Sequence, residues 1–153
     1  MPQIKSDQFT VDYLDTGKGP SVILLPSSAS SNRQWRKLVD KLSSQYRMIS
    51  INLFGYGDTS IWPPDRSQTL DDQADLVVSI AELFEGKVSL IGHSFGGSVA
   101  MRAALRIGER VECLILIEPN MFYLLKNFGR TEAYQDVFNL GQFVKQSGIS
   151  NDW

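Results

Sequence analysis

Residues 89–98 read Ser-Leu-Ile-Gly-His-Ser-Phe-Gly-Gly-Ser and contain the pattern Gly-x-Ser-x-Gly centred on Ser94. An apolar run typical of a buried strand, residues 87–91, precedes this pattern, and a segment of small residues typical of a helix, residues 98–107, follows it. A strand that turns at once into a helix holds its corner residue in a strained conformation, at a cost of about 1–3 kcal/mol. Glycines two positions to either side remove side chains that would collide there. The pattern therefore predicts an exposed serine hydroxyl at the carboxyl edge of a sheet.

The helix after Ser94 is expected to supply hydrogen-bond donors. The N-terminus of a helix carries unpaired backbone N–H groups and favours negative charge. We therefore expect the backbone N–H of Phe95 to donate to an oxyanion that develops on a substrate carbonyl. In the alternative interpretation, the glycines only allow close packing of helix on sheet, and Ser94 is an inert turn residue. The strand and helix on either side of the pattern favour a nucleophile.

Strands and helices alternate along the rest of the chain. Apolar runs predict a strand or hairpin at residues 9–14 and strands at residues 21–25, 46–53 and 111–117. Helical periodicity follows Trp35, and a helix that starts at Thr69 and stops at Gly86 is expected to bury Leu70, Ala74, Val77, Ala81 and Phe84. From residue 121 onwards the pattern is helical and amphipathic. Strands separated by helices predict βαβ units, and hence an α/β fold: a three-layer sandwich with a mostly parallel sheet.

Composition and charge exclude several classes of function. The 153 residues include 15 Lys and Arg against 17 Asp and Glu, so no basic footprint for a nucleic acid exists. Cys113 is the only cysteine, which excludes an internal disulfide framework, and its apolar strand predicts inert packing. No complete nucleotide-binding pattern occurs, and we expect no cofactor and no metal. The chain shows neither a signal-peptide layout nor an apolar run of about 20 residues, so we expect a cytoplasmic protein without a membrane partner.

The chain resembles the α/β-hydrolase family, in its lid-bearing, esterase-like branch. The resemblance rests on residues 21–35, 52–60, 69–72, 92–97 and 111–119. It implies the α/β-hydrolase fold without its C-terminal strands, with residues 1–119 forming the N-terminal part of the core and residues 120–153 the start of a helical lid. It also implies that Ser94 is the nucleophile and that the backbone N–H groups of Ser28 and Phe95 form the oxyanion hole.

The chain departs from the family pattern mainly in the residues that would activate the serine. The usual His-Gly of the oxyanion loop is Pro26-Ser27 here, and the family places its acid and its histidine beyond the strand that ends near Ile117. His93 is the only histidine, and neighbouring side chains of a strand point to opposite faces, so we expect it to be a packing residue beneath the turn. Glu118 has two interpretations: it orders the start of the lid, or it is the triad acid.

We therefore expect the N-terminal portion of a serine-type α/β hydrolase that transfers an acyl group from a small ester or similar carbonyl substrate to Ser94 and then to water. Without a triad histidine, this chain alone is expected to have little or no turnover. Two alternatives stay open: a non-catalytic hydrolase-like protein that binds a small molecule under its lid, and a truncated gene product without independent activity. If the sheet ends at residues 111–117, that apolar strand becomes an exposed edge. The oligomeric state and the substrate are left open.

Overall fold

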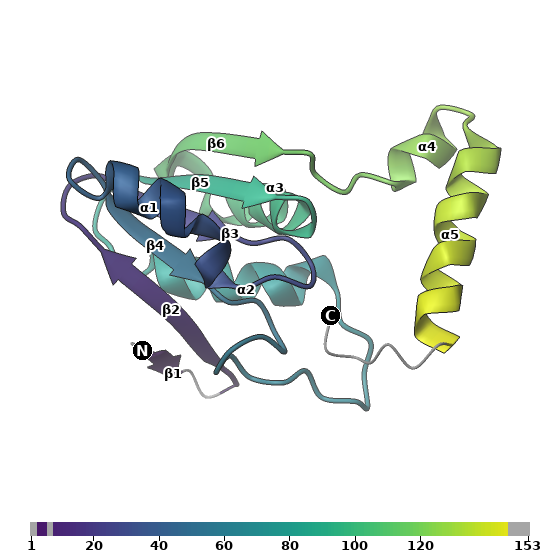
Figure 1. The fold of residues 1–153 in the computed structure, drawn as a ribbon, viewed down its shortest axis with the longest axis horizontal. Coiled ribbons are helices and arrows are strands. Elements are labelled where there is room, and N and C mark those ends of the chain that lie inside the picture. Colours follow the sequence, from purple (N-terminus) through teal and green to yellow (C-terminus); the bar gives the residue numbers. More distant parts are fainter. Residues whose placement is uncertain (1–2, 6–7, 147–153) are drawn as a thin grey trace.

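The computed structural model describes residues 3–5 and 8–146. Within this part of the chain, the strands form one sheet in the order β1-β2-β4-β3-β5-β6 (Figure 1). They are β1 (Gln3–Lys5), β2 (Thr10–Thr16), β3 (Ser21–Leu25), β4 (Arg47–Ile51), β5 (Val88–His93) and β6 (Val111–Ile117). The helices are η1 (Asn32–Trp35), α1 (Arg36–Leu42), α2 (Leu70–Ala81), α3 (Phe95–Ile107), η2 (Gly108–Arg110), α4 (Tyr123–Asn127) and α5 (Thr131–Gln146).

The sheet is mostly parallel, as predicted. β4, β3, β5 and β6 are neighbours in parallel pairs, while β2 runs antiparallel to β4 and forms a hairpin-like antiparallel pair with β1. The predicted strand at 46–53 is shorter, because only Arg47–Ile51 pairs as a strand. Parallel strands need crossover connections, and here these connections are the helices that cover the sheet. The α/β class and the mostly parallel sheet are confirmed.

Alternate residues of β3 show how both faces of the sheet are buried. Val22 and Leu24 pack with Trp35 in a cluster against α1, whereas Ile23 and Leu25 belong to the larger cluster under α2 and α3. Figure 1 shows α1 on one face of the sheet and α2 with α3 on the other. A strand covered on both faces need not alternate in polarity, which explains its continuous apolar sequence.

The predicted start of α2 is confirmed in detail. The Thr69 hydroxyl accepts a hydrogen bond from the Asp72 backbone N–H at 3.3 Å, and the Asp72 carboxylate accepts one from the Thr69 N–H at 2.7 Å. This reciprocal pair is a capping box. Leu70 was wrongly predicted to be buried: it is 41% exposed, because the first residue of the helix lies outside the stripe that packs on the sheet. Phe84 is buried, although the helix ends at Ala81.

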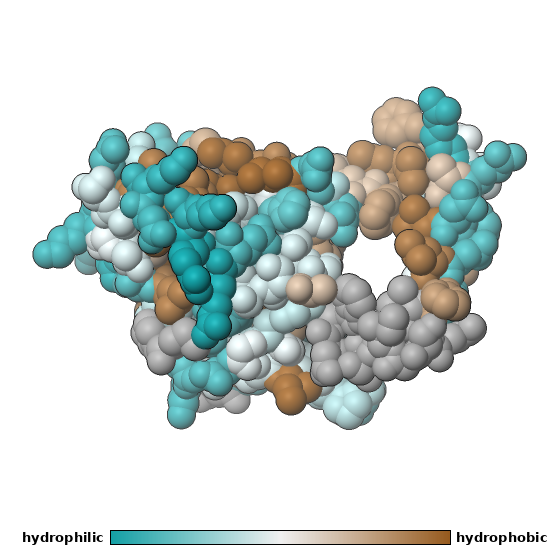
Figure 2. All heavy atoms as spheres, viewed as in Figure 1, coloured by the Kyte–Doolittle hydropathy of each residue, from teal (hydrophilic) through white to brown (hydrophobic). Residues whose placement is uncertain are grey.

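β6 is the last strand of the sheet and pairs with β5 on one side only. Most of its residues are exposed, including Leu114, Ile115 and Ile117. Figure 2 shows an apolar surface along this edge. The expectation of an exposed edge is confirmed, whereas the expectation that Cys113 is packed inside the strand is wrong: Cys113 is exposed, because it lies on the edge strand of the sheet, most of whose residues are exposed.

α4 and α5 extend beyond the carboxyl end of β6 and stand away from the sheet (Figure 1). They contact each other, and several of their large apolar side chains are exposed: Tyr123, Phe138, Leu140 and Phe143. Figure 2 shows apolar surface on the side of this helix pair that faces the sheet. Residues 147–153 of the expected lid lie outside the described residues. No helix in the described ranges is both long and apolar enough to cross a bilayer.

Candidate active site

Ser94 lies in a strained turn between β5 and α3, as its sequence pattern predicts. Its backbone has φ 53° and ψ −119°, a conformation that non-glycine residues rarely adopt. α3 begins at Phe95, three residues earlier than predicted, because this one residue makes the whole turn and the glycines after it already belong to the helix. A Cβ on Gly92 would overlap the Gly96 carbonyl oxygen. The turn therefore requires glycine where the sequence has it.

The loop after β3 packs directly against the start of α3. A Cβ on Gly96 would overlap the carbonyl oxygen of Pro26 and lie 2.5 Å from that of Leu25. This close approach brings the loop that contains Ser28 to the helix N-terminus at Phe95. The two backbone N–H groups expected to form the oxyanion hole therefore lie on segments that are in contact.

Two further contacts hold the loop after β3. Ala29 has a φ of 55°, and its N–H donates to the Tyr56 hydroxyl at 2.8 Å. The N–H and the hydroxyl of Ser27 both donate to Oε1 of Gln34, each at 3.0 Å. The loop is thus ordered by side chains from η1 and from the segment after β4.

Asn120 contacts Ser94 and is a site residue that sequence reasoning missed. The Ser94 hydroxyl donates to Oδ1 of Asn120 at 3.1 Å, and the Asn120 N–H donates to the Ser94 carbonyl at 3.3 Å. The Ser98 hydroxyl donates to the Asn120 carbonyl at 2.7 Å. Because β5 and β6 are parallel neighbours, the residues that follow them meet at the same sheet edge. The predicted parallel strands could therefore have placed the segment after residue 117 near Ser94. The number of residues after the strand does not by itself distinguish Asn120 from its neighbours.

Glu118 makes the turn that brings Asn120 over the serine. Its φ is 45°, and just before it the Ile117 carbonyl accepts a hydrogen bond from the Ser94 N–H at 2.9 Å. The Glu118 side chain is 88% exposed, and its Oε2 lies 4.0 Å from Nε2 of His93. The Glu118 carboxylate thus lies on the side of His93, and the hydroxyl of Ser94 donates to Asn120 instead.

His93 makes a specific polar contact instead of the apolar packing that we expected. Its Nδ1 lies 3.0 Å from Nε2 of Gln34, and about a third of its side chain is exposed. The ring therefore binds η1, whereas the neighbouring hydroxyl of Ser94 binds Asn120. The structure does not bring the single histidine and the serine together as a catalytic pair.

Ion pairs join α2 to α3, the helix that begins at the turn of Ser94. We call this turn between β5 and α3 the elbow. Arg102 donates two hydrogen bonds to the Asp71 carboxylate, at 2.7 and 2.8 Å, and Arg106 lies 2.6 Å from Asp75. The hydrogen bonds from Arg102 lower the pKa of Asp71 below its usual value, and the same contact raises the pKa of Arg102. Both helices are thereby tied along their exposed sides.

A buried polar network supports the loops beside the elbow. The Asn32 N–H donates to Oδ1 of Asn52 at 2.7 Å, and Nδ2 of Asn52 donates to Oδ2 of Asp12 at 2.8 Å. The Asp58 N–H donates to the same carboxylate oxygen at 3.2 Å. The network joins β2, η1 and the segment after β4, and no local sequence pattern indicates the part that Asp12 plays in it.

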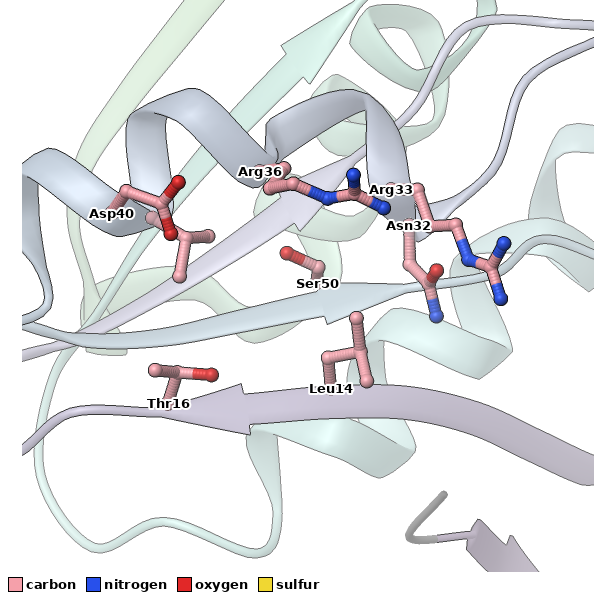
Figure 3. Close-up of a pocket in the computed structure, with 8 residues that line it drawn as sticks. Leu14, Thr16, Asn32, Arg33, Arg36, Asp40 and Ser50 are labelled. Atoms are coloured by element: carbon pink, nitrogen blue, oxygen red, sulfur yellow. The ribbon is translucent and has the colours of Figure 1, made fainter.

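A hollow of about 300 Å³ opens between α1, β2 and β4 (Figure 3). It is lined by Leu14, Thr16, Asn32, Arg33, Arg36, Val39, Asp40 and Ser50. Its lining includes neither Ser94 nor any residue that forms a hydrogen bond with Ser94. Among the described residues, no three His, Cys, Asp or Glu side chains gather in a way that would hold a metal ion.

Comparison with known proteins supports the same fold. A family model described as alpha/beta hydrolase fold matches residues 20–145. A 2-hydroxy-6-oxo-6-(2'-aminophenyl)hexa-2,4-dienoic acid hydrolase of Metapseudomonas resinovorans is 33% identical over 112 residues, which cover 69% of this chain and 37% of the relative. A pimeloyl-[acyl-carrier protein] methyl ester esterase of Nitrosomonas europaea is 34% identical over 67% of this chain and 38% of the relative.

Solved structures of α/β hydrolases also resemble the fold of this chain. A meta-cleavage product hydrolase from Pseudomonas fluorescens IP01 has a TM-score of 0.70 and 31% identity, covering 78% of this chain and 45% of that chain. An epoxide hydrolase from metagenomes of hot environments has a TM-score of 0.74 and 26% identity, covering 81% of this chain and 44% of that chain. The chain thus spans less than half the length of these relatives. The family match over residues 20–145 includes β5, the turn at Ser94 and α3, and the chain belongs to the α/β hydrolase fold family.

Proposed function

We propose that Ser94 is the nucleophile of a serine-type α/β hydrolase that acts on a small ester or similar carbonyl substrate. The observation that carries this proposal is the strained turn at Ser94, with φ 53° at the N-terminus of α3. A fold keeps such strain where a side chain must be presented in one orientation. A relative named as a methyl ester esterase supports the choice of an ester.

In the proposed reaction, Oγ of Ser94 attacks the carbonyl carbon of the substrate and the carbonyl electrons move onto oxygen. The backbone N–H groups of Phe95 and Ser28 donate to that oxyanion, and a preorganised donor of this kind contributes about 10²–10³-fold to the rate. When the carbonyl re-forms, the bond to the alkoxy oxygen breaks, and the alcohol leaves with the proton that the Ser94 hydroxyl has lost. Water then adds to the acyl carbon, the bond to Oγ breaks, and the acid is released while Ser94 regains a proton from that water. The contact of Gly96 with the Pro26 carbonyl supports this placement of the donors.

Among residues 3–5 and 8–146, no general base forms a hydrogen bond with the Ser94 hydroxyl. The Ser94 hydroxyl donates to the amide oxygen of Asn120, which is too weak a base to remove its proton, and the one histidine binds Gln34. A triad enzyme without its base keeps only the residual acceleration of its oxyanion hole and its binding site. We therefore expect this chain alone to form an acyl-enzyme slowly and to turn over little. Glu118 fits a role in ordering the turn after β6 better than a role as acid.

The same proposal assigns residues from 120 onwards to the start of a helical lid. α4 and α5 lie beyond the carboxyl end of the sheet, where Ser94 is, and they expose apolar side chains such as Tyr123 and Phe138 (Figure 1). A lid that closes over a carbonyl substrate would use such a surface to exclude water. The substrate in this proposal is thus a small molecule with an apolar part.

The experiment is to trap the acyl-enzyme with p-nitrophenyl butyrate. The purified chain is incubated with the ester for hours, and intact mass followed by peptide mapping locates the acyl group. We expect one butyryl group on Ser94, which persists because no base assists its hydrolysis. Ser94→Ala should lose the label, whereas Ser98→Ala, which changes a neighbouring hydroxyl that binds Asn120, should retain it. The proposal is overturned if butyryl groups are found only on residues other than Ser94, or if Ser94→Ala is labelled as fast as the unmodified chain.

A non-catalytic, hydrolase-like binding protein is the second candidate. The pairing of the Ser94 hydroxyl with an amide oxygen favours it, because a serine held in this way is not activated. The trapping experiment separates the two candidates. Acylation at Ser94 supports the hydrolase, whereas saturable binding of an ester that leaves Ser94 unmodified and is unaffected by Ser94→Ala supports the binding protein.

A further inference from the structure

Gln34 bridges the two segments that the proposed oxyanion hole requires. Its Oε1 accepts hydrogen bonds from the N–H and the hydroxyl of Ser27, in the loop after β3, each at 3.0 Å. Its Nε2 lies 3.0 Å from Nδ1 of His93, the residue that precedes Ser94. One amide group from η1 therefore links the loop to the elbow.

The directions of these hydrogen bonds follow from the donors. The backbone N–H of Ser27 can only donate, so the Gln34 atom that faces it must be the amide oxygen. The amide nitrogen then faces His93, and because that nitrogen can only donate, Nδ1 of His93 must accept. A ring nitrogen that accepts carries no proton. His93 in this arrangement is therefore neutral, with its proton on Nε2.

The other ring nitrogen supports the same orientation. Nε2 of His93 lies 4.0 Å from Oε2 of Glu118. Rotating the ring by 180° would turn carbon atoms toward both Gln34 and Glu118 and would remove both polar contacts. The hydrogen bond with Gln34 at 3.0 Å therefore sets the orientation of the ring, and the Glu118 carboxylate, at 4.0 Å, is compatible with it but lies beyond hydrogen-bond distance.

We propose that Gln34 is a positioning residue that holds the loop at residues 26–28 against the elbow and fixes His93 as the neutral tautomer protonated on Nε2. The part of this inference that concerns the oxyanion hole rests on the proposed function. The part that concerns the tautomer and the loop does not, because it follows from the donors and acceptors alone. The hydrogen bonds described for the Gln34 side chain go to Ser27 and His93 and not to Ser94, so its proposed effect on catalysis is indirect.

The experiment uses the single histidine of the chain as a probe. The chain is labelled with ¹⁵N-histidine, and the ring nitrogens are recorded by NMR at a pH where the imidazole is neutral. For the unmodified chain we expect an acceptor-type shift for Nδ1 and a protonated-type shift for Nε2. A protonated Nδ1 overturns the proposal.

Two substitutions of Gln34 distinguish its hydrogen bonds with Ser27 from its hydrogen bond with His93. Gln34→Ala removes both ends, so the shifts of His93 should move toward a mixture of tautomers. Gln34→Glu keeps oxygen acceptors for Ser27 but offers a carboxylate to His93, so Nδ1 should become protonated. Gln45→Ala, which changes an exposed glutamine on the turn before β4, is the matched control and should leave His93 unchanged.

The rate of amide hydrogen exchange at Ser27 measures the hydrogen bond from its N–H to Gln34. We expect Gln34→Ala to accelerate exchange of the Ser27 N–H by about 2- to 10-fold, the range that corresponds to the loss of one neutral hydrogen bond. Gln34→Glu should retain the protection while it changes the tautomer. If Gln34→Ala leaves both the tautomer and the exchange rate unchanged, the inference is wrong.

The rate at which p-nitrophenyl butyrate acylates Ser94 connects this inference to the proposed function. We expect Gln34→Ala to slow acylation several-fold and Gln34→Glu to restore most of it. Failure of the unmodified chain to acylate Ser94 would overturn the proposed function, whereas the NMR and exchange results would still decide the role of Gln34. Acylation of Ser94 that is insensitive to Gln34→Ala would contradict the oxyanion part of this inference alone.

Discussion

The hydroxyl of Ser94 donates to Oδ1 of Asn120 at 3.1 Å, across 26 residues of sequence. The same two residues are joined again through their backbones, from the Asn120 N–H to the Ser94 carbonyl at 3.3 Å. These contacts lock the turn after β6 onto the elbow after β5. They hold the serine in one orientation but do not activate it, because the amide oxygen is too weak a base to take its proton.

A double-mutant cycle measures this contact. The variants are Ser94→Ala, Asn120→Ala and the combined variant, and the free energy of unfolding is measured by urea denaturation. A hydrogen bond between neutral groups contributes about 0.5–1.5 kcal/mol, so we expect a coupling energy within that range. The Ser98 hydroxyl binds the backbone carbonyl of Asn120, and a Ser98→Ala/Asn120→Ala cycle should show weaker coupling. Additive effects in the Ser94 cycle would contradict the contact.

Replacing Gly96 with alanine tests the close approach of α3 to the loop after β3. The new Cβ would overlap the Pro26 carbonyl oxygen, and because this neighbour is backbone the loop or the helix must move. We expect a loss of about 1–3 kcal/mol in the free energy of unfolding, as in other overpacked sites.

Gly141→Ala is the matched control for that substitution. Gly141 lies inside α5, and a Cβ there meets nothing within 4 Å. The higher helix propensity of alanine should leave stability unchanged or raise it, by up to about 1 kcal/mol. Thermal unfolding of both variants checks the pair, and equal effects at the two positions would count against the described packing.

The capping box of α2 predicts a stability loss at low pH. Burial alone would raise the pKa of Asp72, but hydrogen bonds from the Thr69 hydroxyl and backbone N–H, together with the charge of Arg66, lower it below its usual 3.8. A lowered pKa in the folded state means that the carboxylate stabilises the fold at pH values above about 3.8, and that this stability is lost as the pH falls through the lowered value.

Urea denaturation between pH 7 and pH 2.5 tests this dependence. Asp72→Asn should be less stable than the unmodified chain at pH 7, and the difference should shrink below pH 3.8. Asp65→Asn, at an exposed aspartate before the helix, should show no such trend. Thr69→Ala should cost about 0.5–2 kcal/mol at pH 7, the usual effect of removing an N-cap. A constant difference between Asp72→Asn and the unmodified chain across this pH range would be evidence against the effect.

The exposed edge at β6 predicts self-association of the chain. Within residues 3–5 and 8–146, no strand pairs with the outer side of β6, which carries apolar side chains such as Ile115, 45% exposed. Such an edge templates pairing with another strand, and a lysine on it opposes that pairing. We expect Ile115→Lys to reduce the fraction of associated chain in sedimentation velocity at a given concentration.

Lys37→Ala, a change at an exposed position of α1 and not on β6, is the control for Ile115→Lys. It should leave the distribution of associated species as it is in the unmodified chain. Association that is equally strong in the unmodified chain and in Ile115→Lys would show that β6 is not the surface responsible.

Local patterns were sufficient for much of the fold. The strand at Ser21–Leu25 and the capping box at Thr69 depend on residues within a few positions of each other, so propensity and periodicity predict them. The strand–turn–helix at Ser94 is also local, because glycine spacing and backbone sterics define it. The resemblance of these segments to the α/β hydrolase fold family was then confirmed by the family match over residues 20–145.

The contacts of the site depended on tertiary structure. Asn120 reaches Ser94 only because β6 pairs in parallel with β5, and Gln34 reaches His93 only because η1 packs against β3 and β4, and β3 is the neighbour of β5 in the sheet. The exposure of Cys113 likewise follows from its place on the edge strand, since its apolar neighbours in sequence predict burial. Side chains far apart in the chain meet through strand pairing and helix packing, and no local pattern of residues records which of them will be neighbours.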